Sequence, residues 1–212
     1  MAKYLKKFET TAQYDAAKSG LILPNVSLIT ENNKVEYNPL QPTPPAPSHD
    51  YVDLGLPSGT KWATMNIGAT SITDYGNYYQ YGKGAATYQE TSGDTPYEGE
   101  EDPLAASADT AVQVWGGSWH MPSSAQCQEL LENTTYEYTT INGVYGCKFT
   151  AQNGQYVFFP IDPQNYHTIC YWTSTPCGGD YPYVLAFHDG VEEPYVGNYS
   201  YEGYLVRGVL DA

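Results

Sequence analysis

The hydrophobic and polar positions of the first 38 residues predict three short elements. The spacing of apolar residues over 8–20 predicts a helix. Residues 25–30 and 34–37 predict two short strands on either side of a turn. A segment of this length cannot enclose a core of its own. We therefore expect its apolar side chains to pack on another subunit or on the rest of the chain.

After residue 50, the pattern of hydrophobic and polar positions predicts a longer series of elements. Residues 51–68 predict two strands joined by a turn at 57–60. The stretch 84–107, rich in polar residues and glycine, predicts a long loop. This part of the chain is long enough to form one domain with its own core.

A helix and a hairpin follow the loop. Residues 122–131 predict a helix, because Ser123 and Gln126 have the spacing of a capping box. Alternation over 143–160 around an Asn-Gly pair predicts a β-hairpin. Strands, then a helix, then many short strands with long loops indicate an α+β fold.

A proline-rich stretch separates these two parts of the chain. Residues 39–49 contain five prolines and predict a semi-rigid, extended spacer. The expected organisation is an N-terminal docking or oligomerisation unit over 1–38, a linker over 39–49 and a ligand-binding domain over 50–212.

Composition points to a surface that binds. The chain has 22 Tyr against 5 Phe, and tyrosine combines a large apolar ring with a polar tip. The net charge is −15, and Arg207 is the only Lys or Arg after Lys148. Phosphate contacts need such residues, so we expect neither nucleic acid nor an anionic membrane as partner. No apolar run follows the first lysines, so we expect no secretory signal and no membrane insertion.

The cysteines and possible catalytic groups give no chemical motif. Because no signal peptide is apparent, the four cysteines are expected to be free thiols, although pairing of Cys170 with Cys177 stays open. No nucleophile–base pair, phosphate loop or motif of paired carboxylates is present. We therefore expect no enzyme activity, no cofactor and no metal site.

Four ordered segments resemble a known family. They are Tyr51 to Gly68, Trp115-Gly-Gly-Ser-Trp-His-Met-Pro-Ser, Tyr171-Trp-Thr-Ser-Thr-Pro and Leu205-Val-Arg-Gly-Val. They look like the C-type-lectin-like variable proteins of diversity-generating retroelements in Bacteroides-type bacteria and their phages. This resemblance covers residues 50–212 and implies a C-type-lectin-like fold with long loops, here preceded by a small N-terminal α/β appendage. Residues 1–38 more weakly resemble the lead segments of phage structural proteins.

The resemblance also implies a hypervariable, ligand-binding surface near the C-terminus. In that family, template adenines are randomised, so Asn codons scatter into other residue types within a fixed frame. Leu185 and Phe187 are expected to be buried. The residues that alternate with them, Val184, Ala186 and His188, are expected to be displayed. The expected ligand-binding residues are Tyr166, His167, Cys177, Gly178, Asp180, Tyr181, Val184, Ala186, His188, Asp189, Tyr195, Asn198, Tyr199, Ser200 and Tyr201.

Other notable residues are expected to be structural. Trp115, Trp119 and Trp172 lie inside shared framework segments and are expected in the core. His120 lies in the Trp-His-Met-Pro segment and is expected to have a structural role. Arg207 is expected to be buried and either hydrogen-bonded or paired with a carboxylate. Lectin-type calcium sites use a Glu-Pro-Asn or Trp-Asn-Asp pattern, and the nearest match, residues 192–195, lacks the asparagine.

These observations together predict a variable adhesin. The favoured context is a phage tail receptor-binding protein, made in the cytoplasm and assembled with virion tail proteins as a homo-oligomer, such as a trimer. Its ligand would be a bacterial surface protein or glycan. The alternatives are a bacterial cell-surface adhesin, a structural subunit and a formylglycine-generating-type enzyme.

Overall fold

The computed structural model divides into two compact units, Met1–Pro45 and Ala46–Ala212. It describes residues 49–87, 104–165, 169–177, 181–188, 191–197 and 199–212, and the strand residues 27–29 and 35–37. In the first unit, β1 (Ser27–Ile29) pairs antiparallel with β2 (Val35–Tyr37), as the sequence predicts. The helix predicted over 8–20 lies outside the described residues.

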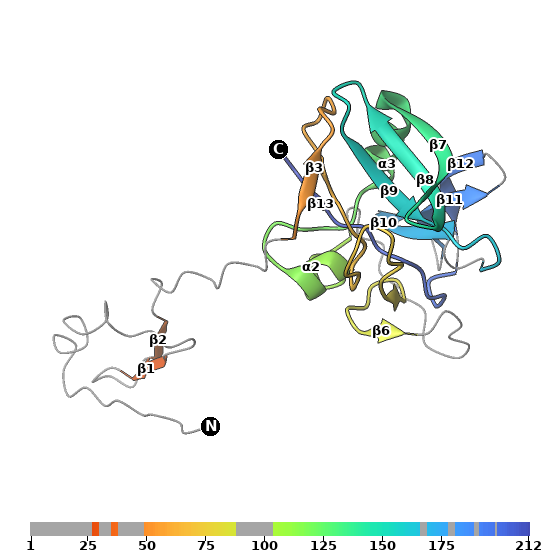
Figure 1. Ribbon diagram of the computed structural model, residues 1–212. Coiled ribbons are helices and arrows are strands. Elements are labelled where there is room, and N and C mark those ends of the chain that lie inside the picture. The colour runs from red at the N-terminus through yellow and green to blue at the C-terminus, as the bar shows by residue number, and fades with distance from the viewer. Residues whose placement is uncertain are drawn as a thin grey trace. The chain divides into compact units, whose positions relative to one another are not determined.

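The second unit combines two short helices with small antiparallel sheets (Figure 1). Its elements are β3 (Tyr51–Asp53), β4 (Lys61–Ala63), β5 (Tyr78–Tyr79), β6 (Ala86–Thr87), α2 (Thr110–Trp115), α3 (Ser124–Asn133), β7 (Thr134–Ile141), β8 (Val144–Ala151), β9 (Tyr156–Pro160), β10 (Cys170–Pro176), β11 (Pro182–His188), β12 (Val191–Gly197) and β13 (Val209–Leu210). The sheets have the strand orders β13-β4-β3, β5-β6, β7-β8-β9 and β10-β11-β12. This confirms the predicted α+β class.

Local capping signals determine where both helices begin. In α3 the Ser123 hydroxyl accepts from the Gln126 N–H, and the Gln126 side chain accepts from the Ser123 N–H, which confirms the predicted capping box. The helix α2 was not predicted. The Asp109 carboxylate caps it, and Gly116, with a φ of 68°, ends it.

Two Asn-Gly turns build the sheet β7-β8-β9. The hairpin β8–β9 turns at Asn153-Gly154, as predicted. The strand β7 was not predicted, although Asn142 and Gly143 join it to β8 with φ angles of 49° and 83°. Positive φ at both positions is the conformation that a two-residue hairpin requires.

The sheet β10-β11-β12 lies between two hydrophobic clusters. Leu185 and Phe187 belong to one cluster, as expected, but Val184 and Ala186 belong to the other and are only 0% and 2% exposed. The expectation that Val184 and Ala186 are displayed is therefore wrong. The four residues 184–187 form an unbroken apolar run, which is typical of a strand covered on both faces.

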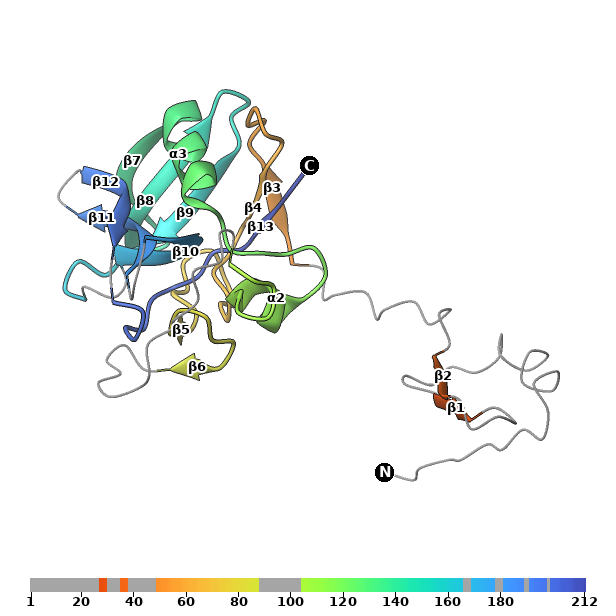
Figure 2. The same ribbon diagram turned by 180° about the vertical axis from the view of Figure 1, so that it is seen from behind.

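The helix α3 packs against strands of the sheets β7-β8-β9 and β10-β11-β12, as Figures 1 and 2 show from opposite sides. The sheet β13-β4-β3 pairs the first and last strands of the unit, with Val209 opposite Trp62. Trp115, Trp119 and Trp172 are buried, which confirms their predicted place in the core.

Arg207 is fully buried and hydrogen-bonded, as expected. Its guanidinium donates to Oδ1 of Asn66 and to the carbonyls of Ala63 and Phe158, each at 2.8 Å. The Asn66 amide in turn donates to the Tyr171 hydroxyl at 3.1 Å. These bonds connect four segments that lie far apart in the sequence.

Candidate ligand-binding surface

The fifteen expected ligand-binding residues fall into three groups. Tyr166, His167, Gly178, Asp180, Asp189 and Asn198 lie outside the described residues. His188 ends β11 and Tyr195 lies in β12, where only the backbone is described. The remaining seven are Cys177, Tyr181, Val184, Ala186, Tyr199, Ser200 and Tyr201.

Three of these residues form an exposed aromatic cluster. The rings of Tyr181 and Tyr199 lie 4.9 Å apart, and those of Tyr199 and Tyr201 are stacked at 5.0 Å. Tyr181 is 42% exposed and Tyr199 43%, and Tyr201 is partly buried. Large apolar side chains rarely gather on a surface without a partner. We call Tyr181, Tyr199 and Tyr201 the tyrosine surface.

The backbone beneath this surface is held by hydrogen bonds. The Ser200 carbonyl accepts from the Tyr81 N–H at 3.1 Å, and the Gln80 amide donates to the Tyr201 carbonyl at 3.1 Å. The Glu202 N–H also donates to the Tyr199 carbonyl at 3.0 Å. A fixed backbone presents the rings with little loss of entropy on binding.

Ser200 is buried, although the sequence-based expectation was that it is displayed, whereas Cys177 is exposed as expected. Ser200 is 1% exposed, because its segment packs against the turn that contains Tyr81, so it is not displayed. Cys177 is exposed, and its N–H donates to the Tyr181 carbonyl at 3.0 Å. Cys177 therefore borders the tyrosine surface.

The electrostatic setting of Tyr201 favours its neutral form. Desolvation, together with the neighbouring Tyr199 and Glu202, raises the pKa of Tyr201, so its phenol stays protonated and can donate a hydrogen bond. Arg207, the only Lys or Arg after Lys148, is buried. The surface therefore offers aromatic area and hydroxyl groups rather than positive charge.

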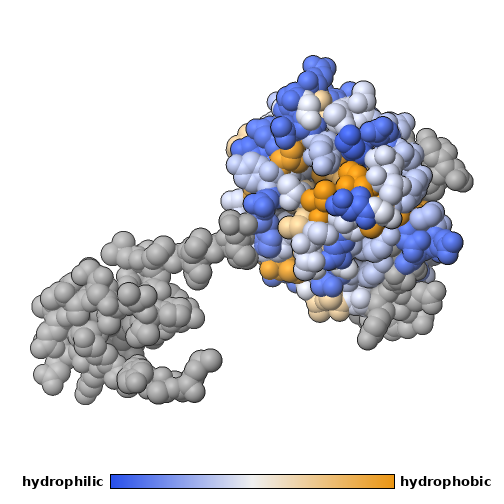
Figure 3. Space-filling view, viewed as in Figure 1, coloured by the Kyte–Doolittle hydropathy of each residue, from blue (hydrophilic) through white to orange (hydrophobic). Residues whose placement is uncertain are grey.

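A second group of exposed tyrosines lies on the sheet β7-β8-β9. Tyr136 is 42%, Tyr145 40% and Tyr156 41% exposed. These residues lie outside the segment expected to vary. Their exposure nearly equals that of Tyr181 and Tyr199, so they provide a matched comparison for mutagenesis. On the face seen in Figure 3, most residues are hydrophilic, with one apolar patch near the centre and smaller ones toward the edges.

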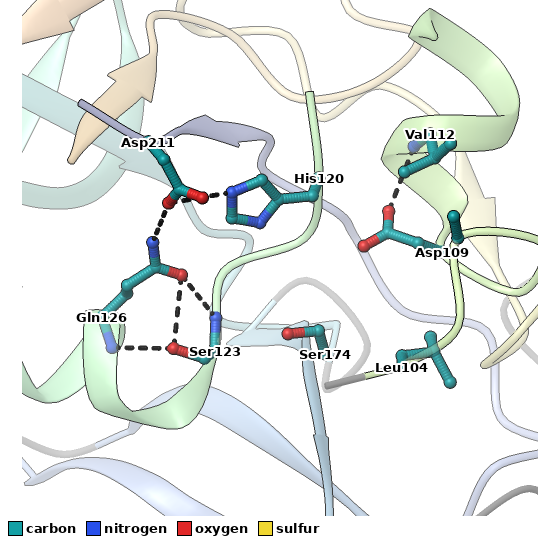
Figure 4. Close-up of a pocket in the computed structure, with 9 residues that line it drawn as sticks. Leu104, Asp109, Val112, His120, Ser123, Gln126, Ser174 and Asp211 are labelled. Carbon is teal, nitrogen blue, oxygen red and sulfur yellow. Dashed lines mark hydrogen bonds and ion pairs between the residues drawn. The ribbon is translucent and has the colours of Figure 1, made fainter. Parts of the chain in front are cut away.

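A cavity lined by described residues of the second unit lies elsewhere. It has a volume of about 610 Å³ and is lined by residues of α2, α3 and the C-terminal segment, among them His120, Gln126 and Asp211 (Figure 4). None of the fifteen expected residues lines it. Its only sequence signals were those of the framework, the Trp-His-Met-Pro segment and the capping box. These signals indicate local structure and carry no information about a cavity.

The four cysteines are free thiols, as predicted. Cys127, Cys147 and Cys170 are buried, and Cys177 is exposed. Burial raises the pKa of Cys127 far above its ordinary range, so this thiol is unreactive. Cys170 and Cys177 lie seven positions apart along an extended strand, a distance of roughly 20 Å.

Metal ligands, membrane spans and relatives give no further assignment. Among the residues that the structure describes, no three His, Cys, Asp or Glu side chains lie together as metal ligands would. No helix in the described parts of the chain is long and apolar enough to cross a membrane. In comparisons with known proteins, the chain matches no family model, no curated protein and no solved structure.

Proposed function

We propose that this protein is a binding module with a C-type-lectin-like fold that recognises a bacterial surface ligand through the tyrosine surface. The observation that carries the proposal is the contact of three rings, with centroids 4.9 and 5.0 Å apart, on a hydrogen-bonded backbone. Tyrosine supplies contact area at a low cost in side-chain entropy. A few such anchors can supply most of the binding energy at an interface.

The favoured context is a phage tail receptor-binding protein, with residues 1–38 docking the domain onto the virion as a homo-oligomer. The weak resemblance of residues 1–38 to phage structural proteins supports this context. A bacterial cell-surface adhesin with the same domain is the alternative. A reverse-transcriptase gene beside a near-repeat of the last part of this gene would support both. Neighbouring tail genes would separate the phage from the bacterium.

The formylglycine-generating enzyme alternative receives no support from the thiols. That chemistry uses a pair of thiols that lie together. Cys170 is buried at the beginning of β10, whereas Cys177 is exposed beyond its end. The binding proposal needs no reacting group, because the tyrosine rings and hydroxyls are sufficient for recognition.

Direct binding to cells tests this proposal. The fluorescently labelled full chain would be incubated with intact cells of a panel of Bacteroides-type strains, and bound label measured by flow cytometry. We expect saturable binding to some strains only. Protease treatment of those cells would remove a protein ligand, and periodate treatment a glycan. Absence of saturable binding to every strain would contradict the proposal.

A further inference from the structure

The cavity of about 610 Å³ brings together residues that are distant in the sequence. Its lining comes from residues 104–112, from residues 120–126, from Ser174 in β10 and from Asp211 at the C-terminus. Pockets that hold small molecules have volumes of about 300–1,000 Å³. The cavity shares no lining residue with the tyrosine surface.

One wall of the cavity is polar, and hydrogen bonds and an ion pair link its side chains. The Gln126 amide donates to Oδ1 of Asp211 at 3.1 Å, and Nε2 of His120 lies 3.2 Å from the same oxygen. The carbonyl oxygen of the Gln126 side chain accepts from the Ser123 N–H at 2.9 Å. The Asp211 side chain is 75% exposed, and its Oδ2 has no hydrogen-bond partner among the described residues. Figure 4 shows these four side chains grouped together.

The opposite wall is largely apolar and includes Leu104 and Val112. Between the two walls lies Ser174, which is only 3% exposed. In Figure 4 no dashed line reaches its hydroxyl, and no described residue hydrogen-bonds to it. The hydroxyl lines the cavity and offers a hydrogen-bonding group to a ligand.

The charge of the lining favours a cation. Asp109 and Asp211 contribute two carboxylates, against one histidine, His120, and no Lys or Arg in the lining. The Asp109 carboxylate already accepts the N–H groups of Ala111, Val112 and Met121, at 2.8–3.1 Å. Asp211 is the acidic group with an oxygen left to bind a ligand.

We propose that this cavity binds a small organic cation. Its protonated amine would pair with the Asp211 carboxylate, and its apolar body would lie against Leu104 and Val112. A polar group on that body would hydrogen-bond to the Ser174 hydroxyl. This binding is independent of the tyrosine surface and of the function proposed for it.

Three indole probes that differ in one group test the proposal. Tryptamine, tryptophol and indole-3-acetate share a ring system and are cationic, neutral and anionic at pH 7. Isothermal titration of the full chain should rank them in that order. Tryptamine should bind about three- to fivefold tighter than tryptophol, as expected for an ion pair with an exposed carboxylate. Absence of binding, or tightest binding of indole-3-acetate, would overturn the proposal.

Variants locate the bound probe. Asp211→Asn keeps an acceptor for Gln126 and should abolish the preference for tryptamine over tryptophol. Ala106→Trp should weaken both probes at least fivefold, because Ala106 lines the cavity. Ser107→Trp, at an exposed neighbour that does not line it, is the matched control and should change neither.

A further variant tests whether tryptamine binds to the tyrosine surface instead of the cavity. Substitution of Tyr181, Tyr199 and Tyr201 by Ser should leave tryptamine affinity unchanged. Loss of tryptamine binding in that variant, or an unchanged probe preference in Asp211→Asn, would overturn the cavity assignment. Neither result would bear on cell binding, so the two proposals fail separately.

Discussion

Arg207 is a buried charge that only neutral acceptors stabilise. Burial lowers its pKa to about 10, and the neighbouring Tyr171 opposes this shift. The group is therefore still charged at neutral pH. Its guanidinium also lies over the Phe159 ring, 4.7 Å from the centroid. No described carboxylate pairs with it, so its three hydrogen bonds must compensate for the desolvation of its charge.

Replacing Arg207 with Met should destabilise the fold severely. The change leaves the Ala63 and Phe158 carbonyls and Oδ1 of Asn66 without their donor, which should cost roughly 3 kcal/mol or more. Urea unfolding would measure the loss. Lys148→Met is the control, since that lysine makes a solvent-accessible ion pair with Glu137 and lies over the exposed Tyr156 ring, and its loss should cost no more than about 1 kcal/mol. Equal losses in the two variants would contradict this account.

Asp109 should make stability depend on pH in the acidic range. Burial raises its pKa, against the opposing effect of the N–H groups of Met121, Val112 and Ala111 and of the His120 charge. The folded state therefore binds this proton more tightly than the unfolded state. Above the folded-state pKa, the ionised Asp109 carboxylate lowers the free energy of unfolding. This loss decreases as the pH falls through the folded-state pKa, and it is gone below the ordinary Asp pKa of 3.8.

The comparison of the parent with Asp109→Asn isolates this effect. Between pH 7 and pH 4, the free energy of unfolding of the parent should rise relative to that of the variant. Urea titrations at several pH values would measure the difference. A difference that stayed constant or changed in the opposite direction would show that burial does not control this carboxyl.

At the scale of elements, β11 is a strand buried on both faces. Val184→Ser should therefore cost about 3 kcal/mol, because it removes a buried apolar side chain and buries a hydroxyl. Tyr181→Ser, just before the same strand, removes an exposed ring and should change stability by about 0.5 kcal/mol or less. Thermal unfolding of the two variants would measure this contrast. If the Val184 variant were as stable as the Tyr181 variant, the Val184 side chain would have to be exposed and not buried.

Elements with a strong local signal were predictable from the sequence. The capping box at Ser123 and Gln126 and the turn at Asn153-Gly154 act over a few residues, so the pattern reveals them. The helix α2 has only six residues, too few for an apolar period to stand out, although Asp109 and Gly116 signalled both of its ends.

Features that depend on packing between distant segments were not predictable. We expected one buried face along β11, although the apolar run 184–187 is also typical of a strand covered on both faces. The second hydrophobic cluster, which covers the other face, is built from segments far away in the chain. The sequence predicted a surface rich in tyrosine, and Tyr181, Tyr199 and Tyr201 do lie together. It could not show that Ser200 is buried, or that residues 104, 174 and 211 line one cavity, because those contacts arise only on folding.

At the scale of the whole molecule, residues 46–212 should fold without the first unit. Every buried core residue among those described lies between Val52 and Val209, and the pairing of β3, β4 and β13 joins the two ends of the unit. The isolated fragment should keep the cooperative thermal unfolding of the full chain, with a similar melting temperature. Light scattering should show an oligomer for the full chain and a smaller species for the fragment. Loss of cooperative unfolding in the fragment, or a monomeric full chain, would contradict this division of roles.

The central claim is that Tyr181, Tyr199 and Tyr201 bind the ligand. Flow cytometry would compare two triple variants on the strains to which the parent binds. One replaces these three residues with Ser, and the other makes the same change at Tyr136, Tyr145 and Tyr156, which are exposed on the sheet β7-β8-β9. The first variant should lose at least about tenfold in affinity, while the second binds like the parent and both keep the parent's melting temperature. Parent-like binding by the first variant, or equal losses in both, would contradict the claim.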